Sequence, residues 1–393
     1  MRGRGGGFRA VVIAVVLGTG CGGSDASPTV LDPGVTAGLD QRGTYPVGVR
    51  TLDLTDTSRP DDRSSNGPRF LKTEVWYPAA ESARGAAPAP AADWVPGALE
   101  PLLPVLTIRG HKLFDFDTGA VRNADVARGP FPLVVFSHGN QASRYQSFTL
   151  CEHLASHGFV VAAPDHIGNT AVSERADGSL VFYSDPFGVP ALEHRIADAS
   201  FVITTILELG AAGSGSFLAG AITTERGVGI AGHSFGGATT VATAARDTRI
   251  TAAVPMAAAI FEDEMPPLSI PSITFVGAED KTVGLEANDG SRAIFAGSVS
   301  PRAFVSIRDA GHFTFSDACV LLPGLFLADG CGEGTRFEDG STFPFIGHDA
   351  AFALMDSIST AFFGATLQGD GELGPLLRAN PAPDAMDYES VGF

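Results

Sequence analysis

The segment Gly232-His233-Ser234-Phe235-Gly236 has the residue types of a serine nucleophile held in a tight turn. It follows the apolar run 227–231 and precedes a helical pattern over 235–245. Glycines two positions before and after the serine let a strand turn sharply into a helix, because side chains there would collide with neighbouring elements. The helix N-terminus also favours negative charge at the exposed hydroxyl. We therefore predict that Ser234 is a nucleophile for acyl transfer.

A serine nucleophile needs a general base, and two histidines follow Ser234 in the chain, His312 and His348. His312 comes just after the predicted strand 303–307, in a loop at the carboxyl end of a strand, where α/β sheets bind ligands. His348 begins a helical pattern, and we expect it at the surface. We predict His312 as the base, since the histidine stands last in the chain order of such triads.

The acid that orients the base should follow the strand that precedes the strand of the histidine. The predicted strand 272–276 leads into Gly277-Ala278-Glu279-Asp280. We choose Asp280, which would hold one tautomer of the imidazole and stabilise the imidazolium. Glu279 is the nearest alternative. Asp309 is the next, although it follows the same strand as His312.

An oxyanion hole is predicted where strand 131–136 leads into Ser137-His138-Gly139-Asn140. Its backbone N–H donors would be those of Asn140 and of Phe235, the residue after the nucleophile. His138 is expected to be a structural hydrogen-bonding residue near the pocket rather than a proton carrier.

Three further residues are candidates for lining the substrate pocket. Asp165 and His166 end a strand near the predicted active face, and Phe313 begins an apolar stretch beside the base. Cys319 and Cys331 follow in a glycine-rich loop, where an exported protein favours a disulfide. Such a disulfide would restrain the segment that carries His312.

An alternation of strands and helices positions these residues. Near-continuous apolar runs, typical of parallel strands covered on both faces, lie at 131–136, 159–163, 227–231, 250–256 and 272–276. Helical patterns lie at 145–156, 192–209, 235–245 and 349–363. Two half-buried antiparallel strands are predicted at 49–54 and 70–77. The order predicts an α/β fold, with a mostly parallel central sheet and helices on both faces.

The chain divides into an N-terminal address, one catalytic domain at 47–363 with an insertion at 79–129, and a polar tail at 364–393. Residues 1–20 combine arginines with a short apolar run, which is typical of a secretory signal peptide. Cys21 stands where bacterial lipoproteins carry their lipid. Residues 21–46 are expected to form a flexible tether. We expect export, with membrane contact only through a lipid on Cys21.

Composition excludes several classes of function. The 26 basic and 44 acidic residues give a net charge of −18, opposite to the basic footprint of nucleic-acid-binding proteins. Four cysteines are too few for a disulfide scaffold. Neither a phosphate-binding glycine loop nor a dinucleotide-binding motif is found, and the predicted chemistry needs no metal or organic cofactor.

The chain resembles α/β-hydrolases of the platelet-activating-factor acetylhydrolase and dienelactone-hydrolase-like group over about residues 47–363. The motifs that carry the resemblance are Trp76-Tyr77-Pro78, Phe136–Gly139, Gly158–His166, Gly232–Gly237 and Gly311-His312-Phe313. The resemblance implies Ser234 as nucleophile, His312 as base, and the N–H groups of Asn140 and Phe235 as the oxyanion hole.

The acid departs from the acetylhydrolase pattern. Those enzymes carry it just after the strand that follows the elbow helix, and the matching stretch here, Pro255–Ala259, has no carboxylate. Asp280 occupies the later position that is usual in dienelactone hydrolases. We therefore expect an exported serine esterase that acts on a short-chain, lipid-like or aryl ester. An acyltransferase on the same triad and a non-catalytic binding lipoprotein stay open as alternatives.

Overall fold

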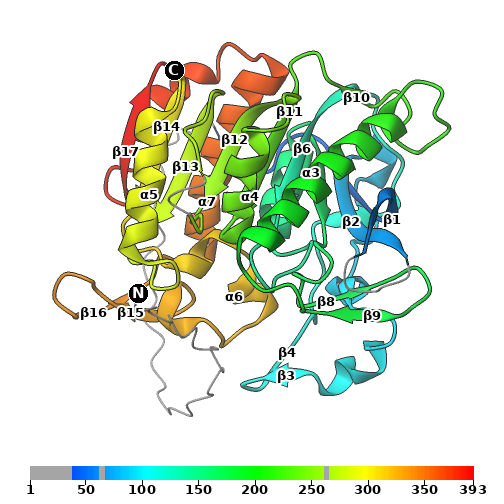
Figure 1. Ribbon diagram of the computed structural model, residues 1–393, viewed down its shortest axis with the longest axis horizontal. Helices are drawn as coiled ribbons and strands as arrows, with labels where there is room; N and C mark the ends of the chain where they lie inside the picture. The colour runs from blue at the N-terminus through cyan, green and yellow to red at the C-terminus, as the bar shows by residue number, and fades with distance from the viewer. Residues whose placement is uncertain (1–37, 62–66, 261–264) are drawn as a thin grey trace, which may run out of the picture.

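A mixed sheet runs through the middle of the protein (Figure 1). The computed structural model describes residues 38–61, 67–260 and 265–393. In that part the sheet has eleven strands in the order β17-β14-β13-β12-β11-β6-β7-β2-β1-β5, with β10 beside β6. The strands are β1 Val47–Pro60, β2 Pro68–Pro78, β5 Ala120–Arg122, β6 Phe131–Ser137, β7 Val160–Pro164, β10 Ile222–Thr223, β11 Val228–His233, β12 Ile250–Met256, β13 Ser272–Gly277, β14 Arg302–Ile307 and β17 Met386–Val391.

The centre of the sheet is parallel. Strands β7, β6, β11, β12, β13 and β14 pair in parallel with their neighbours, whereas β1 with β2, β2 with β7, and β14 with β17 pair antiparallel. The apolar runs of the sequence form the parallel strands, and every residue of β6, β7, β11 and β13 is buried. The predicted strand type is therefore confirmed.

Helices cover both faces of the sheet, as predicted. In Figure 1, α3 (Val189–Gly210), α4 (Phe235–Ala244) and α5 (Gly284–Gly297) lie in front of the sheet. Behind it, α2 (Phe148–Ser156) and α7 (His348–Phe363) pack together in a second apolar layer. Because parallel strands bury both faces, each layer of helices supplies one half of the core.

Short elements fill the loops. The two-stranded ribbons are β3 (Thr107–Ile108) with β4 (His111–Lys112), β8 (Val172–Glu174) with β9 (Leu180–Phe182), and β15 (Glu333–Thr335) with β16 (Thr342–Pro344). The short helices are η1 Glu81–Ala83, η2 Ala91–Trp94, η3 Glu100–Val105, η4 His312–Phe315, α6 Ala318–Leu321, η5 Leu327–Asp329, η6 Gly364–Gln368 and η7 Gly374–Arg378. In Figure 1 these ribbons and helix α6 all lie below the sheet, with β15–β16 on the left and β3–β4 and β8–β9 on the right.

Two predicted boundaries are wrong. Residues 364–393 are not a polar tail, because β17 pairs with β14 along its whole length and closes one edge of the sheet. The described end of the predicted tether, residues 38–46, lies against α2: the N–H groups of Gly43 and Tyr45 donate to Ser156. Residues 1–37, with the predicted signal peptide and Cys21, lie outside the described residues.

Among the described helices, α7 with its continuation to Gln368 is apolar and long enough to cross a membrane by composition and length. However, 78% of its most apolar stretch is buried inside the protein. This burial is what a core helix requires.

Candidate active site

Ser234 occupies a strained turn between β11 and α4. Its backbone angles are φ 58° and ψ −119°, a conformation that costs about 1–3 kcal/mol and needs support from its surroundings. A side chain on Gly232 would lie 2.7 Å from the Ser137 carbonyl oxygen, and one on Gly236 would overlap the same oxygen. The N–H of Ser234 donates to the carbonyl of Met256 on β12. The two glycines and the neighbouring strands therefore fix the serine in this turn.

The structure brings His312 and Asp280 together. Nδ1 of His312 lies 2.8 Å from Oδ2 of Asp280, and the two side chains are 2% and 0% exposed. Their strands, β14 and β13, are parallel neighbours, so both residues emerge at the same edge. The other Asp280 oxygen accepts the N–H groups of Thr282 and Val283, each at 3.0 Å. A carboxylate fixed in this way can hold the proton on Nδ1, which leaves Nε2 of His312 as the basic nitrogen.

The alternative acids have other partners. Glu279 accepts the N–H of Phe337 and pairs with Lys281. Asp309 pairs with Arg336 at 2.6 Å. Of the three carboxylates weighed from the sequence, the one that contacts His312 is Asp280.

A buried chain of hydrogen bonds joins the loops around Ser234. The N–H of Gly139 donates to Oε1 of Gln146 at 2.6 Å, and Nε2 of Gln146 donates to Nδ1 of His233 at 2.7 Å. Nε2 of His233 donates to the carbonyl of His312 at 2.9 Å. Burial, with the nearby His312, holds the pKa of His233 well below its usual range, so this ring is a neutral connector. Gln146 was not identified from the sequence, nor was the role of His233 in linking Gln146 to the loop of His312.

His138 orients the predicted oxyanion loop. Its Nε2 accepts the N–H of His166 at 3.1 Å, so Nδ1 carries the proton and donates to the carbonyl of Gly139 at 2.6 Å. In a trans peptide the N–H points opposite to the carbonyl, so this bond fixes the direction of the Asn140 N–H. A side chain on Gly139 would lie 3.3 Å from Cβ of Ser234. The loop therefore passes beside the serine, and His138 has a structural position.

Two pocket candidates are not at the surface of the site. Asp165 and His166 are both 0% exposed. Asp165 binds the backbone and side chain of Arg144, and Nδ1 of His166 lies 3.0 Å from Asp198. The prediction that they line the pocket is therefore wrong, because neither side chain can reach a substrate.

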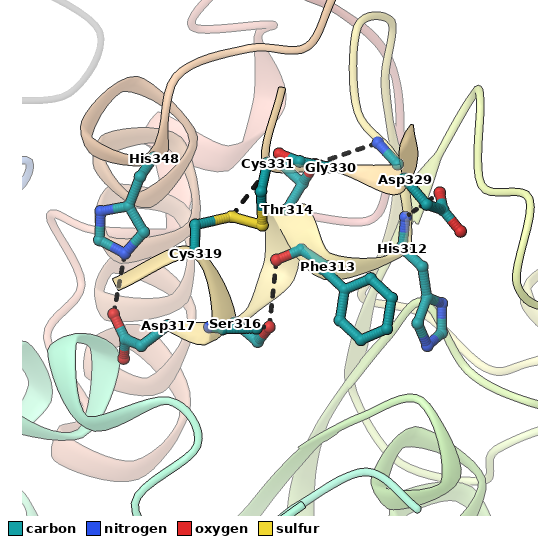
Figure 2. The surroundings of a disulfide bond; sticks show 12 residues. His312, Phe313, Thr314, Ser316, Asp317, Cys319, Asp329, Gly330, Cys331 and His348 are labelled. Atoms are coloured by element: carbon teal, nitrogen blue, oxygen red, sulfur yellow. Dashed lines mark hydrogen bonds and ion pairs between the residues drawn. A yellow bond between two sulfur atoms is a disulfide. The ribbon is translucent and has the colours of Figure 1, made fainter. Parts of the chain in front are cut away.

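Phe313 lies where the sequence placed it, beside the base. Its half-buried ring meets the ring of His312 edge-on, with centroids 5.2 Å apart, and it stacks on Phe326 at 3.8 Å. Figure 2 shows the rings of Phe313 and His312 pointing in the same direction. An apolar group bound near the base would meet this aromatic pair.

The structure contains the predicted disulfide between Cys319 and Cys331, and its loop carries a carboxylate that the sequence did not single out (Figure 2). Oδ1 of Asp329 accepts the N–H of His312 at 2.8 Å and that of Lys281 at 3.1 Å, and Oδ2 accepts the hydroxyl of Thr282 at 2.6 Å. Asp329 thus joins the loop of the base to the loop that follows Asp280. Nothing in the spacing of Asp329 marks it beforehand.

We expect the loss of this disulfide to destabilise the protein. Replacing both Cys319 and Cys331 by serine frees a loop with a sequence separation of 12. A loop of this size corresponds to about 3 kcal/mol of unfolding free energy. Urea unfolding measures the change, and the wild-type protein in excess reductant should show the same loss. An unchanged midpoint in both samples would contradict the expectation.

His348 is not simply a surface residue. Its Nε2 lies 2.8 Å from Oδ1 of the fully buried Asp317, which also accepts the N–H and hydroxyl of Thr149 on α2. Figure 2 shows His348 on the opposite side of the disulfide from His312. Burial disfavours the imidazolium, but the hydrogen bonds and charges of Asp317 and Asp349 outweigh it and raise the pKa of His348.

This raised pKa predicts a pH-dependent stability. The contribution of His348 is complete below the unfolded-state pKa of about 6.5 and is lost as the pH rises through the higher folded-state pKa. We expect His348→Gln to lower the unfolding free energy by about 1 kcal/mol at acidic pH, and by clearly less at alkaline pH. Urea unfolding of both proteins at pH 5.5 and pH 9 measures the two differences. Equal differences at the two pH values would contradict the assignment.

Parts of the chain are similar to known esterases and acetylhydrolases. A family model described as platelet-activating factor acetylhydrolase, isoform II, matches residues 41–176, and one described as PET hydrolase-like matches residues 192–326. A probable 1-alkyl-2-acetylglycerophosphocholine esterase of Arthroderma benhamiae is 25% identical over 54% of this chain and 56% of its own length. A platelet-activating factor acetylhydrolase of Bos taurus is 27% identical over 56% of this chain and 54% of its own length. The matched part thus spans about half of each relative.

A solved structure covers more of the chain. The ferulic acid esterase from Streptomyces cinnamoneus aligns with a TM-score of 0.68 and 25% identity, over 88% of this chain and 97% of its own. This share of the chain is larger than the part that either family model matches. With its mostly parallel sheet, helices on both faces and serine turn, the chain has the α/β-hydrolase fold.

Proposed function

We propose that this protein is a serine carboxylic-ester hydrolase with Ser234, His312 and Asp280 as its triad. The observation that carries the proposal is the turn at Ser234. The strained serine, with φ 58°, follows His233, whose ring binds the backbone carbonyl of His312, and His312 forms a buried pair with Asp280. A strained backbone of this kind persists where the surrounding structure enforces it, and it clusters at active sites. The names of the relatives, acetylhydrolases and esterases, support the same chemistry.

The proposed reaction proceeds through an acyl-enzyme. Nε2 of His312 takes the hydroxyl proton of Ser234 as Oγ bonds to the ester carbonyl carbon. The N–H groups of Asn140 and Phe235 stabilise the oxyanion of the tetrahedral intermediate. Collapse breaks the bond to the alkoxy oxygen, which leaves as the alcohol with the proton from His312. Water then repeats the sequence in the second half and releases the acid.

The substrate is proposed to be a short-chain, lipid-like or aryl ester. Aromatic rings flank the proposed site on two sides: Phe313 and Phe326 beside His312, and Phe187, 46% exposed, against the ring of Phe235 at 4.7 Å. Such rings favour an apolar acyl or aryl group. The matched names include an acetyl-ester hydrolase and a ferulic acid esterase, which differ in that group.

The experiment is hydrolysis of p-nitrophenyl acetate, butyrate, octanoate and palmitate by the purified protein, with Ser234→Ala beside it. Turnover that is lost in the variant supports the proposal, and its dependence on chain length ranks the acyl groups. If the folded wild-type protein hydrolysed none of these esters and was not labelled by a fluorophosphonate, the alternative of a non-catalytic binding lipoprotein would be favoured.

We further propose that the protein is exported and anchored by a lipid on Cys21. The support is the sequence alone, with its arginine-bearing N-terminus and the short apolar run before Cys21. Labelling of cells with a radioactive fatty acid tests the anchor: the wild-type protein should incorporate label and Cys21→Ser should not. Unlabelled protein in the culture medium would support export without an anchor.

A further inference from the structure

Arg195 on α3 is a buried arginine that has no part in the proposed triad. Its side chain is 0% exposed. It points from the helix toward the end of β6, and its nitrogens reach three different elements. Nε donates to the hydroxyl of Thr239 on α4 at 2.9 Å, one terminal nitrogen donates to Oδ1 of Asn169, and the other donates to Oγ of Ser137 at 3.0 Å and to the carbonyl of His138. Each of the three guanidinium nitrogens therefore donates at least one hydrogen bond.

Arg195 holds the loop of the first proposed oxyanion donor from both sides. Ser137 and His138, which accept its hydrogen bonds, come just before Gly139-Asn140 in the chain. On the other side, the side-chain oxygen of Asn169 accepts a hydrogen bond from Arg195. The side-chain nitrogen of Asn169 donates to Oδ1 of Asn140 at 2.8 Å. The Asn169 carbonyl also accepts the N–H of Gln141 at 3.0 Å. The loop can therefore not shift without breaking contacts that lead to Arg195.

The same guanidinium contacts the second proposed donor residue. Its central carbon lies 4.7 Å from the centroid of the Phe235 ring, within the range of a cation–π interaction. Thr239, which accepts from Arg195, donates its hydroxyl to the carbonyl of Phe235 at 2.8 Å. One side chain thus joins the loop of Asn140 to the first turn of α4, whose N–H groups face the nucleophile.

Within the described residues, Arg195 forms no salt bridge with a carboxylate. Within the described residues, its contacts are with neutral oxygens and the Phe235 ring. The nearby Asp198 binds Arg69 through both oxygens and His166 through one. Burial lowers the pKa of Arg195 to about 9, against the opposing attraction of Asp198, so the guanidinium is charged at neutral pH. A positive charge in a dry region interacts more strongly with developing negative charge than it would in water.

We propose that Arg195 is a positioning residue of the oxyanion hole, which sets the relative position of the Asn140 and Phe235 N–H groups and places a buried positive charge behind them. This inference rests on the proposed esterase function. The hydrogen bonds of Arg195 to Ser137, His138, Asn169 and Thr239 fix the two donor segments relative to each other. Preorganised donors of this kind stabilise the transition state more than the bound substrate.

The test compares Arg195→Lys and Arg195→Met with the wild-type protein on the best p-nitrophenyl ester. Methionine removes the charge and the fork, and we expect kcat to fall about 100-fold, as on removal of one oxyanion donor, with KM within about twofold. Lysine keeps the positive charge but lacks the planar guanidinium, and we expect the kcat of Arg195→Lys to lie between those of Arg195→Met and the wild-type protein. The inhibition constant of a boronic acid, whose tetrahedral adduct on Ser234 mimics the oxyanion, should weaken in parallel with kcat.

Arg69→Lys is the matched control, because Arg69 is nearly as buried as Arg195 but donates to Asp198 and to the carbonyl of Ile167 rather than to the oxyanion loop. It should lower the melting temperature while leaving kcat and boronate affinity within about twofold. A loss of stability alone would therefore not imitate the expected result, provided that all assays are run well below the melting temperatures.

Asn169→Ala keeps the inference testable if both Arg195 variants fail to fold. It removes the arm between Arg195 and Asn140, and we expect about a tenfold loss of boronate affinity at unchanged KM. Normal kcat and boronate affinity in the folded Arg195 variants, or in Asn169→Ala when those do not fold, would overturn the inference. Failure of the wild-type protein to hydrolyse any ester would instead overturn the proposed function.

Discussion

Replacing Asp280 by asparagine should lower kcat for ester hydrolysis by about four orders of magnitude. The Asp280 carboxylate accepts a hydrogen bond from Nδ1–H of His312 at 2.8 Å, and two backbone N–H groups donate to its other oxygen. An amide in the same place can present its NH2 group to Nδ1, which then becomes the acceptor and moves the proton to Nε2. The ring would be in the wrong tautomer to take the proton of Ser234. Steady-state kinetics on a short-chain p-nitrophenyl ester measure the loss.

The neighbouring Glu279 supplies the matched control. Glu279→Gln makes the same change of charge one residue away, on a side chain that contacts Lys281 and Phe337 instead of the base. We expect its kcat to stay within about threefold of the wild-type value, as for substitutions outside the reacting groups. If the two variants lost activity equally, Asp280 would not be the acid of the triad.

The parts of the fold that follow from local sequence rules could be predicted. Short continuous apolar runs, alternating with helical patterns, are typical of parallel strands buried on both faces, so β6, β7, β11, β12 and β13 were identifiable from their residues. The serine turn was identifiable because its glycines are required by backbone contacts within a few residues. Its neighbours, the loops after β6, β13 and β14, followed from the rule that ligands bind at the carboxyl ends of parallel strands.

The parts that depend on contacts between distant segments could not be predicted. Strand β17 has the composition of a polar loop, and it becomes a strand because the edge of β14 offers a partner. Asp165 and His166 looked like pocket residues by their position after β7, but their partners Arg144 and Asp198 bury them. The local sequence of a polar residue is the same whether its side chain binds a buried protein partner or a substrate, so the sequence alone does not distinguish the two.

The supporting residues of the site were missed for the same reason. Asp329 and Arg195 lie far in sequence from the residues they hold, and neither belongs to a motif. Their positions can be explained only once the loops are brought together. The sequence thus identifies the residues proposed for the chemistry, whereas the structure is needed to identify the residues that keep them in place.

The second large effect is expected at Gly236. A Cβ there would overlap the carbonyl oxygen of Ser137 and lie 2.7 Å from that of His138, and both obstacles are backbone atoms that cannot rotate away. Gly236→Ala must therefore push β6 and α4 apart or distort the turn at Ser234. We expect a loss of about 4 kcal/mol of unfolding free energy and, in the protein that stays folded, a fall in kcat of about 100-fold.

We expect kcat to fall because the backbone that a Cβ at position 236 displaces is connected to the proposed oxyanion loop. Ser137 and His138 continue directly into the proposed oxyanion loop, so a shift that relieves the overlap also moves the N–H of Asn140 away from Ser234. Gly371→Ala is the control, since a Cβ at this exposed position meets no atom within 4 Å. Urea unfolding and ester kinetics on both variants separate the outcomes. A Gly236→Ala protein of normal stability and activity would mean that the turn is not fixed by this contact, which would remove the main structural support for Ser234 as the nucleophile.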